Sequence, residues 1–278
     1  MDEQAAYADR KDSWDSGDAY ETYVGRWSRL VAREFLGWLA VPPGRRWLDT
    51  GCGTGALAES ILALAAPGEV VGIDPSPAYV TVARDRVSDD PRVGFEVGDA
   101  QALQAPSAAF DAVVSGLVLN FLPEPDGALS EMARVMRPGG VVAAYVWDYA
   151  EDMQMMRHFW DAAVALAPRA SEMDEGRRFT LCNPEPLSDL FRTAELKKVE
   201  VRAIDVPTVF RDFDDYWSPF LGGQGPAPGY AMSLSEESGG RLFASAFGAA
   251  CPPTRKGSTI SSPALGPCEA LSRDTHLL

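Results

Sequence analysis

The sequence is poor in the residues that build metal sites and disulfide frameworks. It has only two histidines, His158 and His276, and its four cysteines include no Cys-x-x-Cys pair. Two histidines argue against a histidine-ligated metal centre, and four scattered cysteines in 278 residues are too few for a disulfide framework. We therefore expect reduced thiols, no bound metal and a cytoplasmic location.

Positive charge and long apolar runs are scarce as well. Lys and Arg total 25 against 40 for Asp and Glu, so the formal net charge is -15. Such a surface repels a polyanion, which argues against a nucleic-acid partner but not against a small anionic ligand. No apolar run approaches the roughly 18–20 residues that span a bilayer, and the acidic start lacks the pattern of a secretory signal. We expect no membrane partner, and the sequence does not indicate an oligomeric state.

Short apolar runs alternate with helical patterns through the first half of the chain. We predict strands at residues 46–49, 70–74, 93–97, 110–115 and 140–147. Helices are predicted at residues 56–66, 75–87 and 125–136, after an amphipathic helix that begins at Ser28 and ends before Pro42. Strands separated by helices predict an α/β fold, in which a parallel sheet carries helices on both faces. Ligands of such sheets bind at the carboxyl ends of the strands.

A glycine-rich loop follows the first predicted strand and opens the next helix. It reads Asp49-Thr50-Gly51-Cys52-Gly53-Thr54-Gly55. Glycines there permit a close approach that a Cβ would block, and the amide groups at a helix start favour a carboxylate or a phosphate. The spacing Gly51-x-Gly53-x-x-Ala56, with Asp74 further along to meet a ribose diol, also fits a dinucleotide fingerprint. An NAD-type oxidoreductase is therefore an alternative on these residues.

Further acids and two later blocks extend the pattern. Asp49 precedes the loop, Gly55 makes it G-x-G-x-G, and Asp99 ends the third predicted strand. With WLDTGCGTGAL (47–57), FDAVVSGLVLNFLPEP (110–125) and MARVMRPGGVVAAYVW (132–147), the chain resembles the class I S-adenosylmethionine-dependent methyltransferases. The resemblance covers roughly residues 20–150 and is closest to the small-molecule branch that includes ubiquinone and menaquinone biosynthesis methyltransferases. It implies a Rossmann-like sheet, S-adenosylmethionine as cofactor and a small-molecule methyl acceptor.

The resemblance also implies which residues bind the cofactor. They are Tyr23, Arg26, Asp49, Gly51, Gly53, Gly55, Asp74, Pro75, Ser76, Asp99, Ala100, Ser115 and Leu117. Asp49 would orient the cofactor's amino group, Asp74 would accept from both ribose hydroxyls, and Asp99 would accept from the adenine amino group. Tyr23 and Arg26 would fold over the cofactor, with the guanidinium facing its carboxylate. The structural alternative for each acid is that it caps a helix or stabilises a loop.

The remaining positions would line the cofactor pocket. The loop glycines would lie beside the methionine part of the cofactor. Pro75 and Ser76 would flank the adenine, and the Ala100 amide would reach a ring nitrogen. Ser115 and Leu117 would lie near the sulfonium. All these roles follow from the resemblance alone.

No catalytic residue is assigned. The family often has a histidine pair after the fourth strand, where this chain has Asn120 and Phe121. Asn120 can orient an acceptor but is not a strong base. His158 lies on a predicted helix beyond the fifth strand, and we interpret it as a surface or core-edge residue rather than a base. A cofactor-binding protein without transferase activity is therefore a second alternative, beside the oxidoreductase.

We divide the chain into four parts. Residues 1–40 form an N-terminal cap segment, 41–150 the cofactor-binding core, 151–240 the completion of the fold and a substrate cap, and 241–278 an irregular tail. Aromatic side chains of the third part either line an apolar substrate cavity or belong to the core. They are Trp160, Tyr216, Trp217, Phe220 and Tyr230.

The tail lacks the two strands that usually end such a fold. Pro, Ser and Gly are scattered through residues 241–278 without a period, as in a disordered tail. A second interpretation is a shifted reading frame near Gly240. One GC-rich reverse translation of residues 242–269, read two bases later, gives LRERLRRRLPTDPEGLDHLIARAWAVRG, whose ending resembles relatives of this chain. The C-terminal strands would then be lost, and the coding DNA decides between the two interpretations.

Overall fold

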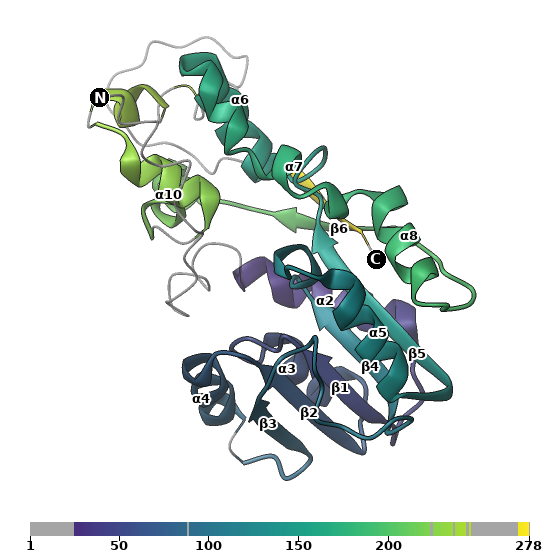
Figure 1. Ribbon diagram of the computed structural model, residues 1–278. Helices are drawn as coiled ribbons and strands as arrows, with labels where there is room; N and C mark the ends of the chain where they lie inside the picture. The colour runs from purple at the N-terminus through teal and green to yellow at the C-terminus, as the bar shows by residue number, and fades with distance from the viewer. Residues whose placement is uncertain are drawn as a thin grey trace. The chain divides into compact units, whose positions relative to one another are not determined.

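A computed structural model describes residues 25–87, 89–222, 225–235, 237–242, 245 and 272–277. Its strands form one seven-stranded sheet in the order β3-β2-β1-β4-β5-β7-β6 (Figure 1). The strands are β1 (Arg46–Thr50), β2 (Glu69–Asp74), β3 (Val93–Val97), β4 (Phe110–Gly116), β5 (Met136–Trp147), β6 (Ala203–Thr208) and β7 (Ser272–Leu277).

The first five strands form the parallel sheet that the sequence predicts. β1 lies between β2 and β4, and Asp49 of β1 is level with Gly72 of β2 and with Val114 of β4. β3 pairs with β2, and β5 pairs with β4, both in parallel. β5 begins at Met136, earlier than predicted, because Met136 already pairs with Phe110 before an irregularity in the register. Parallel strands end at one edge, so the ends of β1, β2 and β4 gather there.

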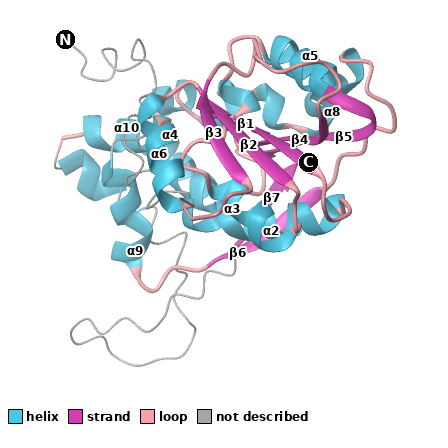
Figure 2. Ribbon diagram, turned by 90° about the horizontal axis from the view of Figure 1, so that it is seen from below, coloured by secondary structure: helices cyan, strands magenta, loops and turns pink. Residues whose placement is uncertain are grey.

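Helices cover both faces of this sheet. They are α2 (Arg26–Leu39), α3 (Ala56–Leu64), α4 (Pro77–Arg86), α5 (Pro125–Val135) and α8 (Pro184–Thr193). α2 packs against α3, and α5 packs against α8, on opposite faces of the sheet (Figure 2). α4 begins at Pro77 because the Ser76 hydroxyl accepts a hydrogen bond from the Tyr79 amide at 3.3 Å, and proline suits the first helical position.

The C-terminal strand differs from the prediction. Residues 272–277 form β7, which runs antiparallel to β5 and pairs Leu277 with Val146 and His276 with Trp147. This strand lies within the stretch for which the sequence analysis expects an irregular tail. Its pairing depends on the edge of β5, which no local pattern in residues 272–277 reveals. The reading-frame hypothesis concerns residues 242–269, which lie almost wholly outside the described residues, and it stays a prediction for the coding DNA.

Tertiary contacts divide the chain into two units. The sheet unit holds residues 25–147, 181–205 and 275–278, so it includes α2 and α8 besides residues 41–147 of the predicted core. The aromatic unit holds residues 148–180 and the described residues between 206 and 274. Its helices are α6 (Gln154–Leu166), α7 (Glu175–Arg178), α9 (Phe213–Trp217) and α10 (Pro226–Ser233).

The aromatic unit has a core of its own. Phe159 of α6 stacks on Phe220 with ring centroids 4.6 Å apart, and it meets Trp160 edge-on at 5.1 Å. Tyr216 donates a hydrogen bond to the Met155 carbonyl at 3.0 Å, so its hydroxyl is satisfied inside this core. None of the helices in the described part of the chain is long and apolar enough to cross a membrane.

Candidate functional site

The glycine loop turns sharply between β1 and α3. Gly51, Gly53 and Gly55 all have positive φ angles, of 72°, 51° and 89°. The amides of Gly51 and Cys52 both donate to the Ile73 carbonyl, at 2.7 and 3.0 Å, which ties the loop to β2. A Cβ on Gly51 would lie 2.6 Å from a methyl group of Val118. The loop therefore has room for backbone but none for a side chain at Gly51.

Asp49 is a buried acid at the end of β1. It is 1% exposed, and neither carboxylate oxygen accepts a hydrogen bond of normal length and angle in the structure, although the Ala58 amide lies near it. Burial, and then the neighbouring negative charge of Asp74, raise the pKa of Asp49 to about 7, although the Ala58 amide opposes this. An uncompensated carboxylate in the interior is costly, so this position calls for a positively charged or hydrogen-bond-donating ligand.

Asp74 holds the loop at the end of β2. One carboxylate oxygen accepts from the Gly53 amide and the other from the Ser76 amide, both at 2.9 Å. Burial raises the pKa of Asp74, and the two amides partly offset the shift. Each oxygen keeps a further lone pair, so both can still accept from a diol. Asp74 thus joins the loop of β1 to the turn after β2.

Asp99 and its neighbours lie after β3 and β2. Asp99 is exposed, and its carboxylate accepts from the Gln101 amide at 2.9 Å, as in the structural alternative for this acid. Ala100 is buried, whereas Pro75 is exposed. Ser76 caps α4 as described above. The predicted contacts of these four residues with an adenine ring stay predictions.

Hydrogen bonds from the hydroxyl groups of Ser115 and Thr50 connect β4 and β1. The Ser115 hydroxyl donates to the Thr50 carbonyl at 2.9 Å, and the Thr50 hydroxyl donates to the Val114 carbonyl at 3.1 Å. Leu117 follows at φ 62° and is buried, with its amide donating to the Tyr145 carbonyl. The Ser115 hydroxyl is therefore used between strands, and a role as a pocket residue stays a prediction.

Replacing Ser115 with alanine is expected to lower the free energy of unfolding by about 1–2 kcal/mol, because a buried carbonyl loses its side-chain donor. The affinity for S-adenosylhomocysteine should stay within about twofold. Urea unfolding and calorimetry measure the two quantities. Ser130→Ala is the control, since its exposed hydroxyl makes a similar bond to the Asp126 carbonyl. Weaker binding without lost stability would show that the Ser115 hydroxyl contacts the cofactor.

Asn120 was not among the predicted cofactor residues. It lies on the short helix η2 (Leu119–Phe121), directly after β4. Both its Oδ1 and its Nδ2 are shielded from solvent and lack a hydrogen-bond partner in the structure. The sequence offered only the indirect signal that the resembling family often has a histidine here.

The N-terminal pair is only partly described. Tyr23 lies outside the described residues. Arg26 opens α2, and its guanidinium lies 4.3 Å from the centre of the Trp27 ring. Its predicted place opposite a carboxylate stays a prediction. The contacts above unite Asp49, the glycine loop, Asp74 and Ser76, which all belong to the sheet unit.

The aromatic residues after position 150 pack against one another. The five that the sequence analysis singled out are each 9% exposed or less, and ring contacts connect them directly or through Phe159. They are Trp160, Tyr216, Trp217, Phe220 and Tyr230. The structure therefore favours the core interpretation over that of a substrate cavity. His158 on α6 is half-buried, which lowers its pKa, and its interpretation as a surface or core-edge residue stays a prediction.

A second buried acid, Glu175, lies in the aromatic unit and was not predicted from the sequence. Glu175 is 1% exposed and accepts hydrogen bonds from the Trp160 indole and, at 3.2 Å, from the Ala227 amide. Burial raises the pKa of Glu175 to about 8. Its two oxygens connect α6 to the first turn of α10, where a negative charge is favourable. Both are satisfied, so we interpret Glu175 as structural.

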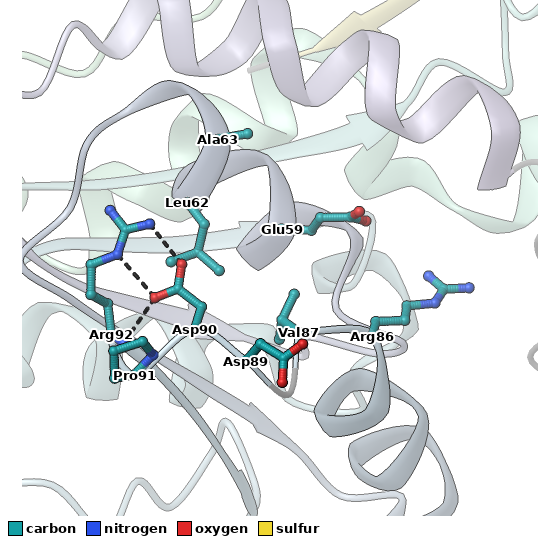
Figure 3. A pocket seen from close by; sticks show the side chains of 9 residues that line it. All are labelled: Glu59, Leu62, Ala63, Arg86, Val87, Asp89, Asp90, Pro91 and Arg92. Carbon is teal, nitrogen blue, oxygen red and sulfur yellow. Dashed lines mark hydrogen bonds and ion pairs between the residues drawn. The ribbon is translucent and has the colours of Figure 1, made fainter.

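A hollow of about 630 Å³ lies beside α3 and the end of α4 (Figure 3). Its lining is charged, but Asp90 and Arg92 pair with each other at 2.6 Å. The hollow contains none of the predicted cofactor residues. It therefore marks a solvated surface rather than the site.

Comparisons with known proteins agree with the geometry. Residues 48–144 match a family model described as a methyltransferase domain. A 2-methyl-6-phytyl-1,4-hydroquinone methyltransferase of Synechocystis sp. is 30% identical over 187 residues, which cover 66% of this chain and 57% of that protein. A demethylmenaquinone methyltransferase of Symbiobacterium thermophilum is 36% identical over 121 residues, or 42% and 48% of the two chains. The chain thus spans about half the length of the curated relatives it matches.

A solved structure resembles nearly the whole chain. It is a Haemonchus contortus phosphoethanolamine N-methyltransferase 2 in complex with phosphomonomethylethanolamine and S-adenosylhomocysteine. The TM-score is 0.57 at 19% identity, over 98% of this chain and 58% of that chain. At this identity the likeness concerns the fold alone, and it confirms the predicted Rossmann-like α/β class.

Proposed function

Because the chain carries a domain of the class I methyltransferase family, we propose that it binds S-adenosylmethionine at the glycine loop and methylates a small molecule. The observation that carries this proposal is the unpartnered Asp49 carboxylate, buried beside Asp74. S-adenosylmethionine brings an ammonium group and a sulfonium, and both are cations. The pyrophosphate of a dinucleotide is an anion that would lie at the same helix start, where Asp49 would repel it. The acid therefore favours the methyltransferase over the oxidoreductase.

The residues present fit this cofactor. The loop offers a backbone cradle that a Cβ at Gly51 would fill, and Asp49 offers an orphaned carboxylate for an ammonium. Asp74 offers two oxygens for the ribose hydroxyls while it keeps its amide partners. When bound, the cofactor supplies a methyl group on a good, neutral leaving group. The protein's part is then to align the acceptor and exclude water, which needs position more than strong acid or base groups.

For the acceptor, we propose a hydroxylated aromatic ring of the hydroquinone type. The support is that one relative above is named for methylation of a 1,4-hydroquinone and the other for methylation of demethylmenaquinone, a quinone whose reduced form is a hydroquinone. A ring hydroxyl donates electron density to neighbouring carbons, so these carbons can attack a methyl group after modest activation. The acidic surface supports a small acceptor over a nucleic acid. We propose a cytoplasmic location, which fits a chain without paired cysteine motifs.

Titration of the purified protein with S-adenosylhomocysteine tests the cofactor. We expect binding in the micromolar range, no binding of NAD, and a loss of about 100-fold or more in affinity for Asp74→Ala, which removes both ribose contacts and the loop bonds. Asp90→Ala is the matched control, because Asp90 also accepts from an amide, that of Arg92, but lies in the hollow of Figure 3. Folded wild-type protein that binds NAD, or neither ligand, would contradict the proposal.

Turnover separates an enzyme from a cofactor-binding protein without activity. Wild-type protein that binds S-adenosylhomocysteine should also transfer a labelled methyl group from S-adenosylmethionine to some member of a hydroquinone and naphthohydroquinone panel. Binding without any transfer would favour the protein without transferase activity.

A further inference from the structure

The segment after β4 returns toward the glycine loop. Leu117 takes a left-handed conformation, with φ 62°, and its amide is held by the Tyr145 carbonyl at 2.8 Å. The next residue, Val118, lies against Gly51, within 3 Å of where a Cβ there would be. The Phe121 amide then donates to the Val118 carbonyl at 2.8 Å and closes η2. These bonds hold Asn120 on η2, two residues after Val118, the residue that lies against the glycine loop.

The Asn120 carboxamide is buried without partners. Its Oδ1 and Nδ2 are both shielded from solvent, and neither makes a hydrogen bond in the structure. Desolvating an amide without replacing its hydrogen bonds is unfavourable, and buried polar groups in native proteins almost always have a partner. A leucine has nearly the same size and carries no such penalty. The residue is therefore unfavourable for the ligand-free fold, at a position beside the proposed cofactor site.

We propose that Asn120 is a positioning residue that holds a hydroxyl group of the methyl acceptor. This inference rests on the proposed function and names the group of the acceptor that the site recognises. A carboxamide has one acceptor and one donor side, and both are unsatisfied here. A hydroxyl satisfies both, since it donates to Oδ1 and accepts from Nδ2. A carbonyl would satisfy only Nδ2, and an ammonium would satisfy only Oδ1.

Such a contact aligns the acceptor rather than moving its proton. The carboxamide is neutral and does not titrate near neutral pH, so the proton of the attacking group leaves to water or to another base. Holding the hydroxyl fixes the orientation of the ring to which it is attached. Because the carboxamide is shielded in this structure, neighbouring side chains shift when the acceptor binds.

Stability of the ligand-free protein is the first test. Asn120→Leu is expected to raise the melting temperature by a few degrees, because it removes the unsatisfied amide. Asn183→Leu is the matched control, because Asn183 precedes α8 in the same unit and is a half-exposed asparagine. It should not stabilise the protein. A fall in melting temperature for Asn120→Leu would mean that the amide is structural, and would overturn the proposal.

Binding and turnover are the second test. With 2-methyl-1,4-naphthohydroquinone and its 1,4-dimethyl ether, which has no hydroxyl, as anaerobic probes, wild-type protein should favour the hydroquinone. Asn120→Leu should reduce that preference by about tenfold or more, with the affinity for S-adenosylhomocysteine within about twofold of wild type. Asn120→Asp should keep the bond to the hydroxyl proton and make turnover depend on pH near the carboxyl pKa.

The outcomes distinguish this inference from the proposed function. Equal losses of S-adenosylhomocysteine affinity and of turnover would assign Asn120 to the cofactor and overturn the inference. So would wild-type protein that binds S-adenosylhomocysteine but neither binds nor methylates either probe. Wild-type protein that does not bind S-adenosylhomocysteine at all would instead contradict the proposed function itself.

Discussion

Replacing Asp49 with asparagine is expected to stabilise the ligand-free protein at pH 8 and, at the same time, to weaken its binding of S-adenosylhomocysteine by about tenfold or more. The two effects have one cause. The buried carboxylate lacks a partner in the structure, so its charge is unfavourable until an ammonium group arrives. Asparagine has the same shape and no charge.

The pH dependence follows from the raised pKa of Asp49. The pKa is about 7 in the folded protein and 3.8 in the unfolded chain. Between about pH 4 and pH 7, Asp49 is therefore protonated in the folded protein and ionised in the unfolded chain. Stability is therefore lost as the pH rises from about 4 to about 7, by roughly 4 kcal/mol in all, and stays constant above pH 7. The asparagine of the Asp49→Asn variant does not titrate, although its own amide lacks a partner. We expect a gain of about 2 kcal/mol at pH 8 that shrinks towards pH 4.

Urea unfolding at several pH values measures this gain, and calorimetry measures the affinity. Asp74→Asn is the matched control, because it removes a charge from the same site. Asp74 accepts from two backbone amides, and an asparagine would turn its NH₂ group towards one of them. That variant should lose stability at pH 8, where Asp49→Asn gains it. Unchanged affinity in Asp49→Asn would contradict the role of Asp49 as the partner of an ammonium group.

Replacing Gly51 with alanine is expected to abolish measurable S-adenosylhomocysteine binding and to destabilise the fold by about 2–4 kcal/mol. Two effects combine at this residue. The φ of 72° is unfavourable for a residue with a Cβ, and that Cβ would lie 2.6 Å from a methyl group of Val118. Valine is stiff at χ1, so the loop or the segment after β4 must move. Either movement displaces the loop backbone that we propose as the cradle of the cofactor.

Gly53→Ala separates the two effects. Gly53 has a similar φ of 51°, but no atom lies within 4 Å of a Cβ placed there. Gly53→Ala should therefore lower the free energy of unfolding only through its unfavourable φ, by about 1–2 kcal/mol. Adding Val118→Ala to Gly51→Ala removes the clashing methyl groups. The free energy of unfolding of this double variant should therefore rise to that of Gly53→Ala. Thermal unfolding and calorimetry measure both quantities. Equal stability of the Gly51→Ala and Gly53→Ala variants would show that Val118 moves away from the new Cβ without destabilising the fold.

Local sequence patterns were sufficient for most of the sheet unit. Alternating strands and helices specify parallel β-α-β units, since each amphipathic helix has to cover a face of the sheet. The first five strands, the sharp loop at Gly51 and the placement of Asp74 at a strand end follow from that, whereas the order of the strands in the sheet was not predicted. β7 could not be predicted, because its pairing partner lies more than a hundred residues away on β5. The division into two units also depends on contacts between distant segments.

The sequence by itself determined the fold class, the glycine loop and the three acids at or after strand ends. Only the tertiary structure decided what surrounds them. It gave Asp74 two amide partners and left Asp49 and Asn120 with none, and it engaged the Ser115 hydroxyl between strands. The physical reason is that a residue's type sets which bonds it can make, whereas its burial and its partners come from segments that the chain brings together only on folding.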